Sequence, residues 1–374
     1  MSIIIGADIV PCKSNLELFI NGKAEALAGE ELLEVLRKAD YRICNLEVPL
    51  TDQETPIHKH GPNLIAPTSS VNGLKALGID MVTLANNHIL DQGPSGLEST
   101  IRALEEAGVS HVGAGKDLND AREPLYHMIG DKRIGFYVCA EHEFSIATEH
   151  LPGANPYDAL NTFDDIQETK KACDYLIVLY HGGKEHYRYP SPGLQRVCRK
   201  MVEKGADLVV CQHSHCIGCK EEYLQGTIVY GQGNFIFSAQ NNEFWNTGLL
   251  INLNDRGEIS YLPLMRTESG ARLASGDEGK EITEAFYRRS KEIQKEGFIE
   301  ERYREFARES LDGYIRYFSA THNSLFYKGI NRLFRNIIRG RAVRRYLQNK
   351  KTGMTNYIEC EAHRELLLEG LKNR

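Results

Sequence analysis

The chain has 374 residues, of which 41% are hydrophobic, and its formal net charge is -6. This composition supports a sizeable core and excludes a disordered or fibrous protein. The mild charge gives no nucleic-acid character to the whole molecule, so we expect no specific nucleic-acid partner. The chain starts MSIIIGADIVP, with no basic leader and only a short apolar run. We therefore expect no signal peptide, no transmembrane segment and a cytoplasmic protein.

Up to about residue 265, short β-rich apolar runs alternate with amphipathic stretches of helical period. This alternation is typical of a sheet covered by helices and predicts an α/β domain over residues 1–270. The predicted strands, in chain order, are residues 3–8, 42–46, 81–85, 133–140, 175–180, 208–211 and 228–230. The predicted helices between them include residues 30–39, 95–107 and 192–204. A β-hairpin is predicted from residues 248–254 and 259–264, joined by the turn 254–257.

The composition changes near Gly276. Residues 276–374 are charged and periodic at helical spacing, which predicts a helical C-terminal region. Within it, residues 328–351 carry nine Lys and Arg residues and no acidic residue, interleaved with an apolar stripe. We interpret this segment either as an amphipathic helix with a solvated basic face or as a surface for an anionic partner or a membrane.

The nine cysteines are odd in number and scattered through predicted strands, which indicates reduced, buried thiols. Cys211, Cys216 and Cys219 cluster, but no second pair at matching spacing follows them. We therefore do not expect a structural zinc site there.

Polar residues that can do chemistry follow the ends of the predicted strands. In chain order they include Asp8, Glu47, Asn87, His88, Glu141, His142, Glu143, His181, His213 and His215. Because ligand sites collect at the carboxyl ends of strands in α/β sheets, we expect these side chains to converge. One histidine at a strand end is more often part of the architecture, but this mixture favours a metal site. Its oxygen and nitrogen ligands predict one or two divalent ions, Mn, Fe or Zn, in a hydrolytic centre.

Five ordered motifs carry a resemblance to a known family: NLEVPLT (45–51), ANNHILD (85–91), YHGGKE (180–185), QHSH (212–215) and GQGNF (231–235). Together they resemble the CapA family, proteins linked to capsule and poly-γ-glutamate synthesis within the calcineurin-like metallophosphatase superfamily. The resemblance covers residues 3–265. It implies a metallophosphatase-like, four-layered α/β/β/α sandwich, here with a helical C-terminal appendage.

The resemblance also implies roles for particular residues. The metal ligands that it implies are Asp8, Glu47, Asn87, His181, His213 and His215. Asp8 and His215 would hold the first ion, Glu47 would bridge both ions, and the other three would hold the second ion. His88 stands where the superfamily keeps a general acid, and Asp91 is near enough in sequence to orient it. The alternative is that Asn87, His88 and Asp91 only build a tight loop.

The sequence departs from the superfamily pattern at two positions. The second ligand of the first motif, a histidine two residues after Asp8, is replaced by Val10. The first ion therefore keeps fewer ligands, and the candidates to fill the gap are Glu143, Glu185 and His142. Gln212 stands where a glycine usually precedes the paired histidines, which could crowd the second ion. Binding of a single ion thus stays open.

Several loop residues near these motifs are expected to face substrate: Glu141, Glu143, Glu185 and His186. Charged loop residues are more often simply solvated, so each is a weak candidate alone. Gly231, Gly233 and Asn234 are predicted to form a tight turn beneath the site.

Two hypotheses for the function follow. The first is a metal-dependent hydrolase related to capsule or poly-γ-glutamate metabolism that cleaves a phosphoester or an amide or γ-glutamyl bond in a small-molecule or polyanionic substrate. The second is a non-catalytic accessory protein that binds an anionic polymer through the basic C-terminal helix. Metal content together with turnover of generic substrates separates the two hypotheses.

Overall fold

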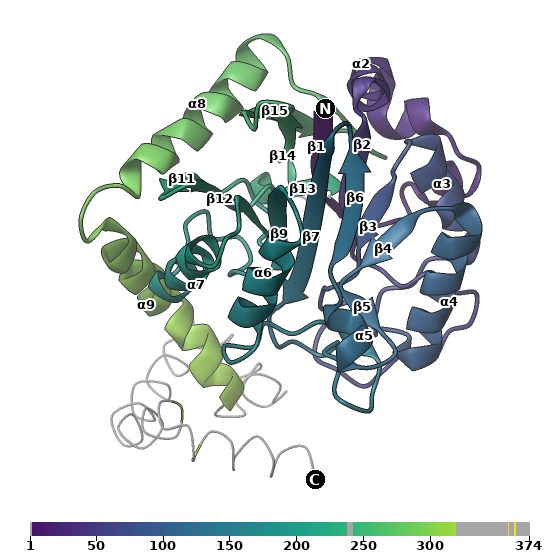
Figure 1. The fold of residues 1–374 in the computed structure, drawn as a ribbon, viewed down its shortest axis with the longest axis horizontal. Coiled ribbons are helices and arrows are strands. Elements are labelled where there is room, and N and C mark those ends of the chain that lie inside the picture. The colour runs from purple at the N-terminus through teal and green to yellow at the C-terminus, as the bar shows by residue number, and fades with distance from the viewer. Residues whose placement is uncertain (1, 238–241, 319–357, 359–362, 364–374) are drawn as a thin grey trace, which may run out of the picture. The chain divides into compact units, whose positions relative to one another are not determined.

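The computed structural model describes residues 2–237, 242–318, 358 and 363 (Figure 1). Contacts between residues divide the chain into two compact units, Met1–Ile299 and Glu300–Arg374. The strands form sheets of eight, six and two strands. The predicted domain division between residues 270 and 276 stays a prediction, and the basic segment 328–351 lies outside the described residues.

The larger sheet is built around β1 (Ser2–Ile9), an apolar strand that is buried along almost its whole length. Such continuous burial is expected of a central strand covered on both faces. β1 runs parallel to β2 and to the short β13 (Asn234–Ile236), and antiparallel to β14. In spatial order, the other strands are β16 (Ala271–Leu273), β15 (Ile259–Arg266), β14 (Thr247–Asn254), then, beyond β1, β2 (Tyr41–Leu46), β3 (Met81–Thr83) and β4 (Ser110–Val112).

The smaller sheet has a parallel centre formed by β7, β9, β10 and β12, with antiparallel strands at both edges. In spatial order its strands are β11 (Lys220–Tyr223), β12 (Gly226–Tyr230), β10 (Leu208–Gln212), β9 (Tyr175–His181), β7 (Lys132–Ala140) and β6 (Leu125–Ile129). The third sheet pairs β5 (Ala114–Gly115) with β8 (Gly153–Ala154). All seven predicted strands and the predicted hairpin are confirmed, with small shifts at their ends.

The helices described are α1 (Leu16–Ile20), α2 (Ala24–Lys38), α3 (Val71–Ala76), α4 (Gly93–Ala107), α5 (Leu118–Arg122), α6 (Thr162–Lys171), α7 (Pro192–Glu203), α8 (Gly276–Glu292) and α9 (Phe298–Phe318). The three helices predicted before residue 205 are present. In α2 the backbone leaves the helical conformation at Gly29, with φ 65°. The regular part of this helix therefore begins at about Glu30, as the sequence predicts.

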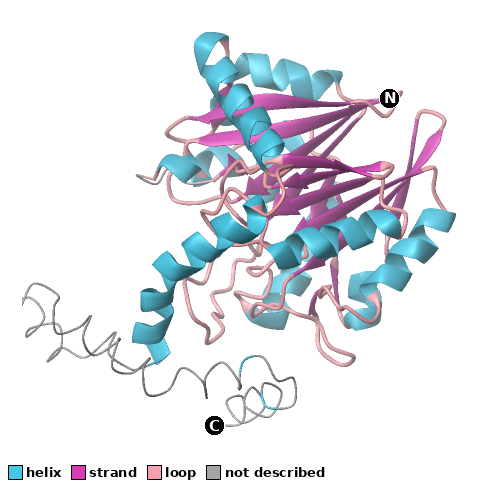
Figure 2. Cartoon of the chain, turned by 90° about the vertical axis from the view of Figure 1, so that its left-hand side faces the viewer, coloured by secondary structure: helices cyan, strands magenta, loops and turns pink. Residues whose placement is uncertain are grey.

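The smaller sheet buries both of its faces, and this makes the first unit a layered structure (Figure 2). Ile134, Phe136 and Val138 of β7 point into the core that contains the larger sheet, while the alternate residues Tyr137 and Cys139 belong to a second core. That second core includes buried residues of α6 and α7, whereas α2 and α4 contribute leucines to the first core. The order is helices, sheet, sheet, helices, which confirms the predicted four-layered sandwich.

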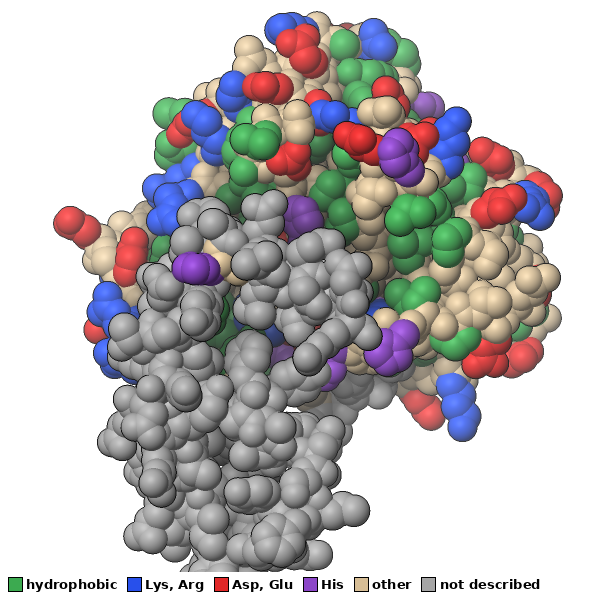
Figure 3. All heavy atoms as spheres, turned by 90° about the horizontal axis from the view of Figure 1, so that it is seen from below, with side chains coloured by type: hydrophobic (Ala, Val, Ile, Leu, Met, Phe, Trp, Pro, Cys, Tyr) green, Lys and Arg blue, Asp and Glu red, His purple; other side chains and the backbone are tan. Residues whose placement is uncertain are grey.

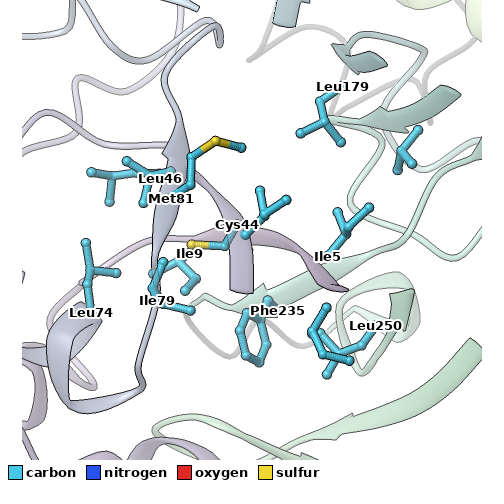
Figure 4. Close-up of a cluster of buried hydrophobic side chains, with 14 of the residues drawn as sticks. Ile5, Ile9, Cys44, Leu46, Leu74, Ile79, Met81, Leu179, Phe235 and Leu250 are labelled. Atoms are coloured by element: carbon cyan, nitrogen blue, oxygen red, sulfur yellow. The ribbon is translucent and has the colours of Figure 1, made fainter. Parts of the chain in front are cut away.

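The core beside β1 fixes the position of β13. Phe235, one of the core residues labelled in Figure 4, is 1% exposed, and a Cβ on Gly6 would lie only 2.7 Å from its ring. Gly6 thus provides the space that lets the Phe235 ring pack against β1. Burial of a side chain of this size stabilises a fold by about 1.5–3 kcal/mol, so this packing is a firm constraint on β13.

The helical C-terminal region predicted from residue 276 is confirmed for α8 and α9. α8 is part of the first unit, and the ring centroid of its Phe286 is 4.8 Å from that of Tyr261 on β15. None of the helices described combines the length and the apolar composition needed to span a bilayer. On the face drawn in Figure 3, basic and acidic side chains are interspersed over the described residues.

Candidate metal centre

Four polar side chains converge at the carboxyl end of β9. His181, the last residue of this strand, places Nε2 3.1 Å from Asn87 Oδ1 and 3.1 Å from His213 Nδ1. The same nitrogen is 3.3 Å from Glu47 Oε1. Ligand atoms bound to one ion at about 2.0–2.2 Å lie roughly 3.0–3.6 Å apart, so these four residues, the second group, fit a single divalent ion.

Asp8 and His215, together with Glu47, form what we call the first group. Their ligand atoms lie within 4.8 Å of one another, and His215 Nδ1 is 3.5 Å from Asp8 Oδ2. Glu47 belongs to both groups. A carboxylate shared by two sets of ligands is the arrangement that a two-metal hydrolytic site requires.

The strand ends of both sheets supply these residues. Asp8 lies on β1 and Glu47 directly follows β2 in the larger sheet, while His213 and His215 follow β10 in the smaller sheet. The two imidazoles are presented by backbone with φ values of 83° at His213 and 51° at His215. Positive φ at a non-glycine residue costs about 1–3 kcal/mol, and such strain collects at functional sites.

The buried carboxylates of both groups are short of hydrogen-bond donors. Among the described residues, no donor makes a hydrogen bond to either carboxylate oxygen of Glu47 or to Oδ2 of Asp8. Both residues are nevertheless 0% exposed. A buried carboxylate without donors is strongly destabilising unless a cation compensates it. The donor set, with two carboxylates, three imidazoles and an amide, therefore fits divalent transition metals.

The surroundings of Asp8 and Glu47 shift the pKa values of their carboxyl groups in opposite directions. Burial, reinforced by the charge of Asp8, raises the pKa of Glu47 to about 8. Burial alone would also raise the pKa of Asp8, but the nearby imidazole of His215, 3.5 Å away, and the charge of His181 lower it. Near neutral pH the ion-free site thus holds one carboxylate and one largely protonated carboxyl group.

The pKa values of the three imidazoles are also shifted in different directions. Burial lowers the pKa of His181 to about 4. Burial, together with the charges of His181 and His215, lowers the pKa of His213 well below its usual value. Burial opposes the charged form of His215, but the charge of Glu47 and the nearby carboxylate of Asp8 raise its pKa to about 9. His181 and His213 are therefore neutral near pH 7, the form that binds metals.

Two side chains orient the ligands. Asn45 Nδ2 donates to Asp8 Oδ1 at 2.8 Å, and Asn45 Oδ1 accepts from Thr83 Oγ1 at 3.1 Å. Glu143 Oε2 accepts from Asn87 Nδ2 at 2.8 Å, which leaves the amide oxygen of Asn87 for the second group. Sequence reasoning missed Asn45, although it lies in the quoted NLE motif, and proposed Glu143 as a ligand rather than an orienting residue.

The two departures from the superfamily pattern have structural consequences. Val10 is buried in the apolar core and supplies no ligand atom. Gln212 Nε2 donates to Gly6 O at 3.2 Å and also contacts Gln232 Oε1 at 3.4 Å. Gln212 therefore links the two sheets beneath the site.

His88 and Asp91 lie together, as their spacing suggests. Asp91 Oδ2 is 2.6 Å from His88 Nδ1, and it also accepts from the backbone N–H of Leu64 at 2.6 Å. A residue that sequence reasoning missed, Lys59, pairs with Asp91 Oδ1 and lies 3.2 Å from His88 Nδ1, with a side chain only 2% exposed. The contact with Asp91 occupies Nδ1 and leaves Nε2 as the nitrogen that can exchange a proton with a substrate.

A cavity of about 180 Å³ opens beside the second group. Its lining residues are Asn87, Glu141, His142, Glu143, His181, Gly183, Lys184 and His213. Glu141 and Glu143, two of the residues expected to face substrate, are therefore in position to do so. The cavity places acidic, basic and amide groups next to the imidazoles that could hold an ion.

Glu185 and His186 lie outside this lining set. His186 has φ 60°, accepts a hydrogen bond from Trp245 Nε1 at 2.9 Å and stacks on Phe244 with ring centroids 5.4 Å apart. Trp245 in turn stacks on His215, with ring centroids 4.6 Å apart. His186 therefore belongs to an aromatic cluster that covers the first group. Glu185 is near enough for the charges of His213 and His215 to lower its pKa against the effect of burial.

The fold and this site define an α/β sandwich with a candidate metal centre shared between its two sheets. Residues 17–239 match the family described as bacterial capsule synthesis protein PGA_cap. The chain belongs to this family, as its resemblance to CapA proteins implies.

The chain is similar to two CapA proteins of Bacillus. It is 33% identical over 211 residues to the capsule biosynthesis protein CapA of Bacillus anthracis, covering 54% of this chain and 51% of that protein. It is 31% identical over 210 residues to the PGA biosynthesis protein CapA of Bacillus subtilis (strain 168), covering 54% of each. The chain thus spans about half the length of the curated relatives it matches.

Solved structures give only a weak likeness. A structure of a novel phosphatase from Mycoplasma pneumoniae aligns with a TM-score of 0.46 at 13% identity, covering 72% of this chain and 94% of that chain. At this score the alignment carries no argument about the site or its activity.

Proposed function

We propose that this protein is a metal-dependent hydrolase that acts in capsule or poly-γ-glutamate metabolism. The observation that carries the proposal is that the first and second groups share Glu47, whose buried carboxylate oxygens have no hydrogen-bond donor among the described residues. In this proposal the first group and the second group each hold one divalent ion, Mn, Fe or Zn. A bound ion lowers the pKa of a water molecule and polarises the bond to be cleaved.

The chain's own residues bind the ions and handle a proton. Asp8, Glu47 and His215 hold the first ion, and Glu47 with the rest of the second group holds the other. His88 donates a proton from Nε2 to the leaving group, because Asp91 accepts from Nδ1 and is itself paired with Lys59. Proton transfer of this kind contributes about 10²–10⁴-fold to hydrolysis.

The substrate class follows from the relatives and the cavity. The name of the Bacillus subtilis relative refers to PGA biosynthesis, which supports a polyanionic or glutamyl substrate here. Lys184 in the cavity lining supplies a cation for an anionic substrate group, next to the ligand imidazoles. A phosphoester and an amide or γ-glutamyl bond are both compatible with this chemistry, because activated water attacks either centre.

Metal content is the first test. Wild-type protein, purified without chelators or a metal-affinity column, is expected to carry one or two transition-metal ions, and His213→Ala is expected to lose the second-group ion. Elemental analysis measures both. The control is His111→Ala, which removes an imidazole on β4 beside Glu105. Wild-type protein that holds no ion and cannot be loaded would contradict the hydrolase and favour the accessory protein that binds an anionic polymer.

A substitution at His88 tests the proton donor. His88→Asn is expected to lower kcat about 10²–10⁴-fold towards phosphoesters or γ-glutamyl amides, because no group would protonate the leaving group. The ion content should stay at the wild-type value, since His88 is in neither group. Steady-state kinetics on a panel of both substrate types provides the measurement. Unchanged kcat with an unchanged ion content would assign His88 to the loop structure alone.

A further inference from the structure

Asn234 lies beside the first group although its motif reads as a turn. It begins β13, and its Cα pairs with that of Asp8 across the parallel β1 and β13 strands. Gly233 before it has φ 74°, and a Cβ there would lie 2.6 Å from Thr247 O. This backbone therefore requires glycine and directs the chain into β13. The Asn234 side chain is buried as a result, with the residue only 1% exposed.

The amide of Asn234 meets His215 in the way that Asn87 meets His181. Asn234 Oδ1 is 2.8 Å from His215 Nδ1, and Asn87 Oδ1 is 3.1 Å from His181 Nε2. Each of these imidazole nitrogens is also close to a buried carboxylate oxygen, at 3.5 Å from Asp8 Oδ2 and at 3.3 Å from Glu47 Oε1. Two amide oxygens thus occupy equivalent places, one in each half of the site.

The local chemistry points to a ligand rather than to a simple structural contact. Among the described residues, Asn234 Nδ2 and Asp8 Oδ2 are both buried without a hydrogen-bond partner. A buried amide whose only side-chain hydrogen bond is to an imidazole nitrogen is costly if it serves packing alone. An ion at this point would place the amide oxygen, the imidazole nitrogen and the carboxylate oxygen in one coordination sphere.

We propose that Asn234 is a ligand of the first ion through Oδ1, and that it takes the place of the histidine ligand that is absent at position 10, where the sequence has Val10. The first ion then has Asp8, Glu47, His215 and Asn234, three oxygen ligands and one nitrogen ligand. The second ion has two oxygens and two imidazoles. Because the first set contains more oxygen, it favours a harder ion such as Mn, whereas the second set suits Zn or Fe. This inference rests on the proposed metal-dependent function.

The chain provides its own reporter for the first ion. Trp245 is the single tryptophan in the sequence, and its ring stacks on His215 with centroids 4.6 Å apart. An open-shell ion such as Co²⁺ bound to His215 should therefore quench tryptophan fluorescence. An ion bound only to the second group lies farther from the ring and should quench less. Fluorescence thus reads the first group without any need for turnover.

The test titrates Co²⁺ into ion-free protein and follows tryptophan fluorescence, visible absorption and bound Co²⁺. Asn234→Leu is expected to weaken the fluorescence phase by about 100-fold or more, since loss of an orienting contact alone costs roughly 10–100-fold. Asn234→Asp, which offers a carboxylate oxygen at the same place, is expected to bind at least as tightly as wild type. If Asn234→Leu fails to fold, the Co²⁺ affinity of Asn234→Asp tests the ligand assignment instead.

Two control variants are titrated in the same way. His213→Ala should keep the fluorescence phase and lose the other ion. Asn155→Leu removes a different buried amide, one that donates to Val138 O at 2.7 Å, and should leave both ions in place.

The outcomes separate this inference from the function on which it rests. Wild type that binds no ion overturns both. Wild type that binds two ions, with Asn234→Leu also binding two at similar affinity, overturns the ligand assignment alone. A weaker phase in Asn234→Leu with an unchanged Co²⁺ absorption spectrum would make Asn234 an orienting partner of His215, and this also overturns the ligand assignment.

Discussion

Glu47→Gln is expected to abolish binding of both ions, the largest effect of any single substitution in the site. Glu47 is the one residue common to the first and second groups. A neutral amide keeps the shape of the side chain but removes the charge that compensates two cations. Equilibrium dialysis with elemental analysis measures the loss, and Glu98→Gln, an exposed substitution on α4, is the control. Retention of either ion would show that Glu47 does not bridge.

The same substitution is expected to stabilise the ion-free protein at high pH. The folded-state pKa of Glu47, about 8, lies above the ordinary value of 4.5, so the folded state binds the proton more tightly. Ion-free wild type therefore loses stability as the pH rises from about 4.5 to about 8, by at most roughly 4–5 kcal/mol. Urea unfolding of the ion-free proteins at pH 6 and pH 9 should show about 2–3 kcal/mol of this loss from Glu47 in wild type, and a smaller total loss in Glu47→Gln.

Ion binding itself is expected to depend steeply on pH. In the ion-free site the pKa of Glu47 is about 8 and that of His215 about 9, so both carry protons at neutral pH. Both must deprotonate to act as ligands, so binding displaces about two protons. The apparent affinity should rise by up to about 100-fold per pH unit below pH 8 and level off above pH 9. His181 and His213, whose pKa values are lowered, add little to this slope.

Calorimetry in buffers of different ionisation enthalpy counts these protons directly. Glu47→Gln cannot serve as the comparison, because it is expected to bind no ion, so His215→Gln takes this role and should release about one proton fewer. A proton count near zero at pH 7 would mean that the two groups are already deprotonated. The electrostatic description of the site would then be wrong.

Strong local patterns made most of the fold predictable. β1, β7, β9 and β10 are apolar runs that are buried on both faces, and such runs are visible in a sequence. Short strands such as β4 and β13 carry no such signal, because their conformation depends on pairing with a neighbour. The motif around Gly231 and Gly233 reads as a turn, and only its packing against β1 reveals that a strand follows.

The candidate site was predictable for a related reason. Residues at the carboxyl ends of parallel strands meet in space, so Asp8, Glu47, His181 and the two histidines after β10 could be grouped from their positions alone. Lys59 could not be found in this way, since it lies in a loop without periodicity and reaches His88 and Asp91 only after folding.

The change of composition near residue 276 indicates a helical region, whose first helix, α8, falls within the compact unit Met1–Ile299. α8 is charged on its exposed surface, and this gives the segment its distinct composition. It nevertheless buries Phe286 completely and hydrogen-bonds β11, where Lys220 N donates to Ser290 Oγ at 2.9 Å. A composition shift reports the solvent-facing residues, whereas the unit boundary depends on the few residues that are buried.

The candidate ligands come from two different sheets, and this has a mechanical consequence. Asp8 and Glu47 lie on or directly after strands of the larger sheet, whereas His181 and the histidines after β10 lie on or directly after strands of the smaller one. An ion held by both sides would act as a reversible cross-link between layers, in a protein whose described cysteines are all free thiols. A ligand at 1,000 times its Kd adds about 4 kcal/mol to the free energy of unfolding. The concentration of available metal would then affect the stability of the packing between the two sheets, independently of any reaction catalysed at the site.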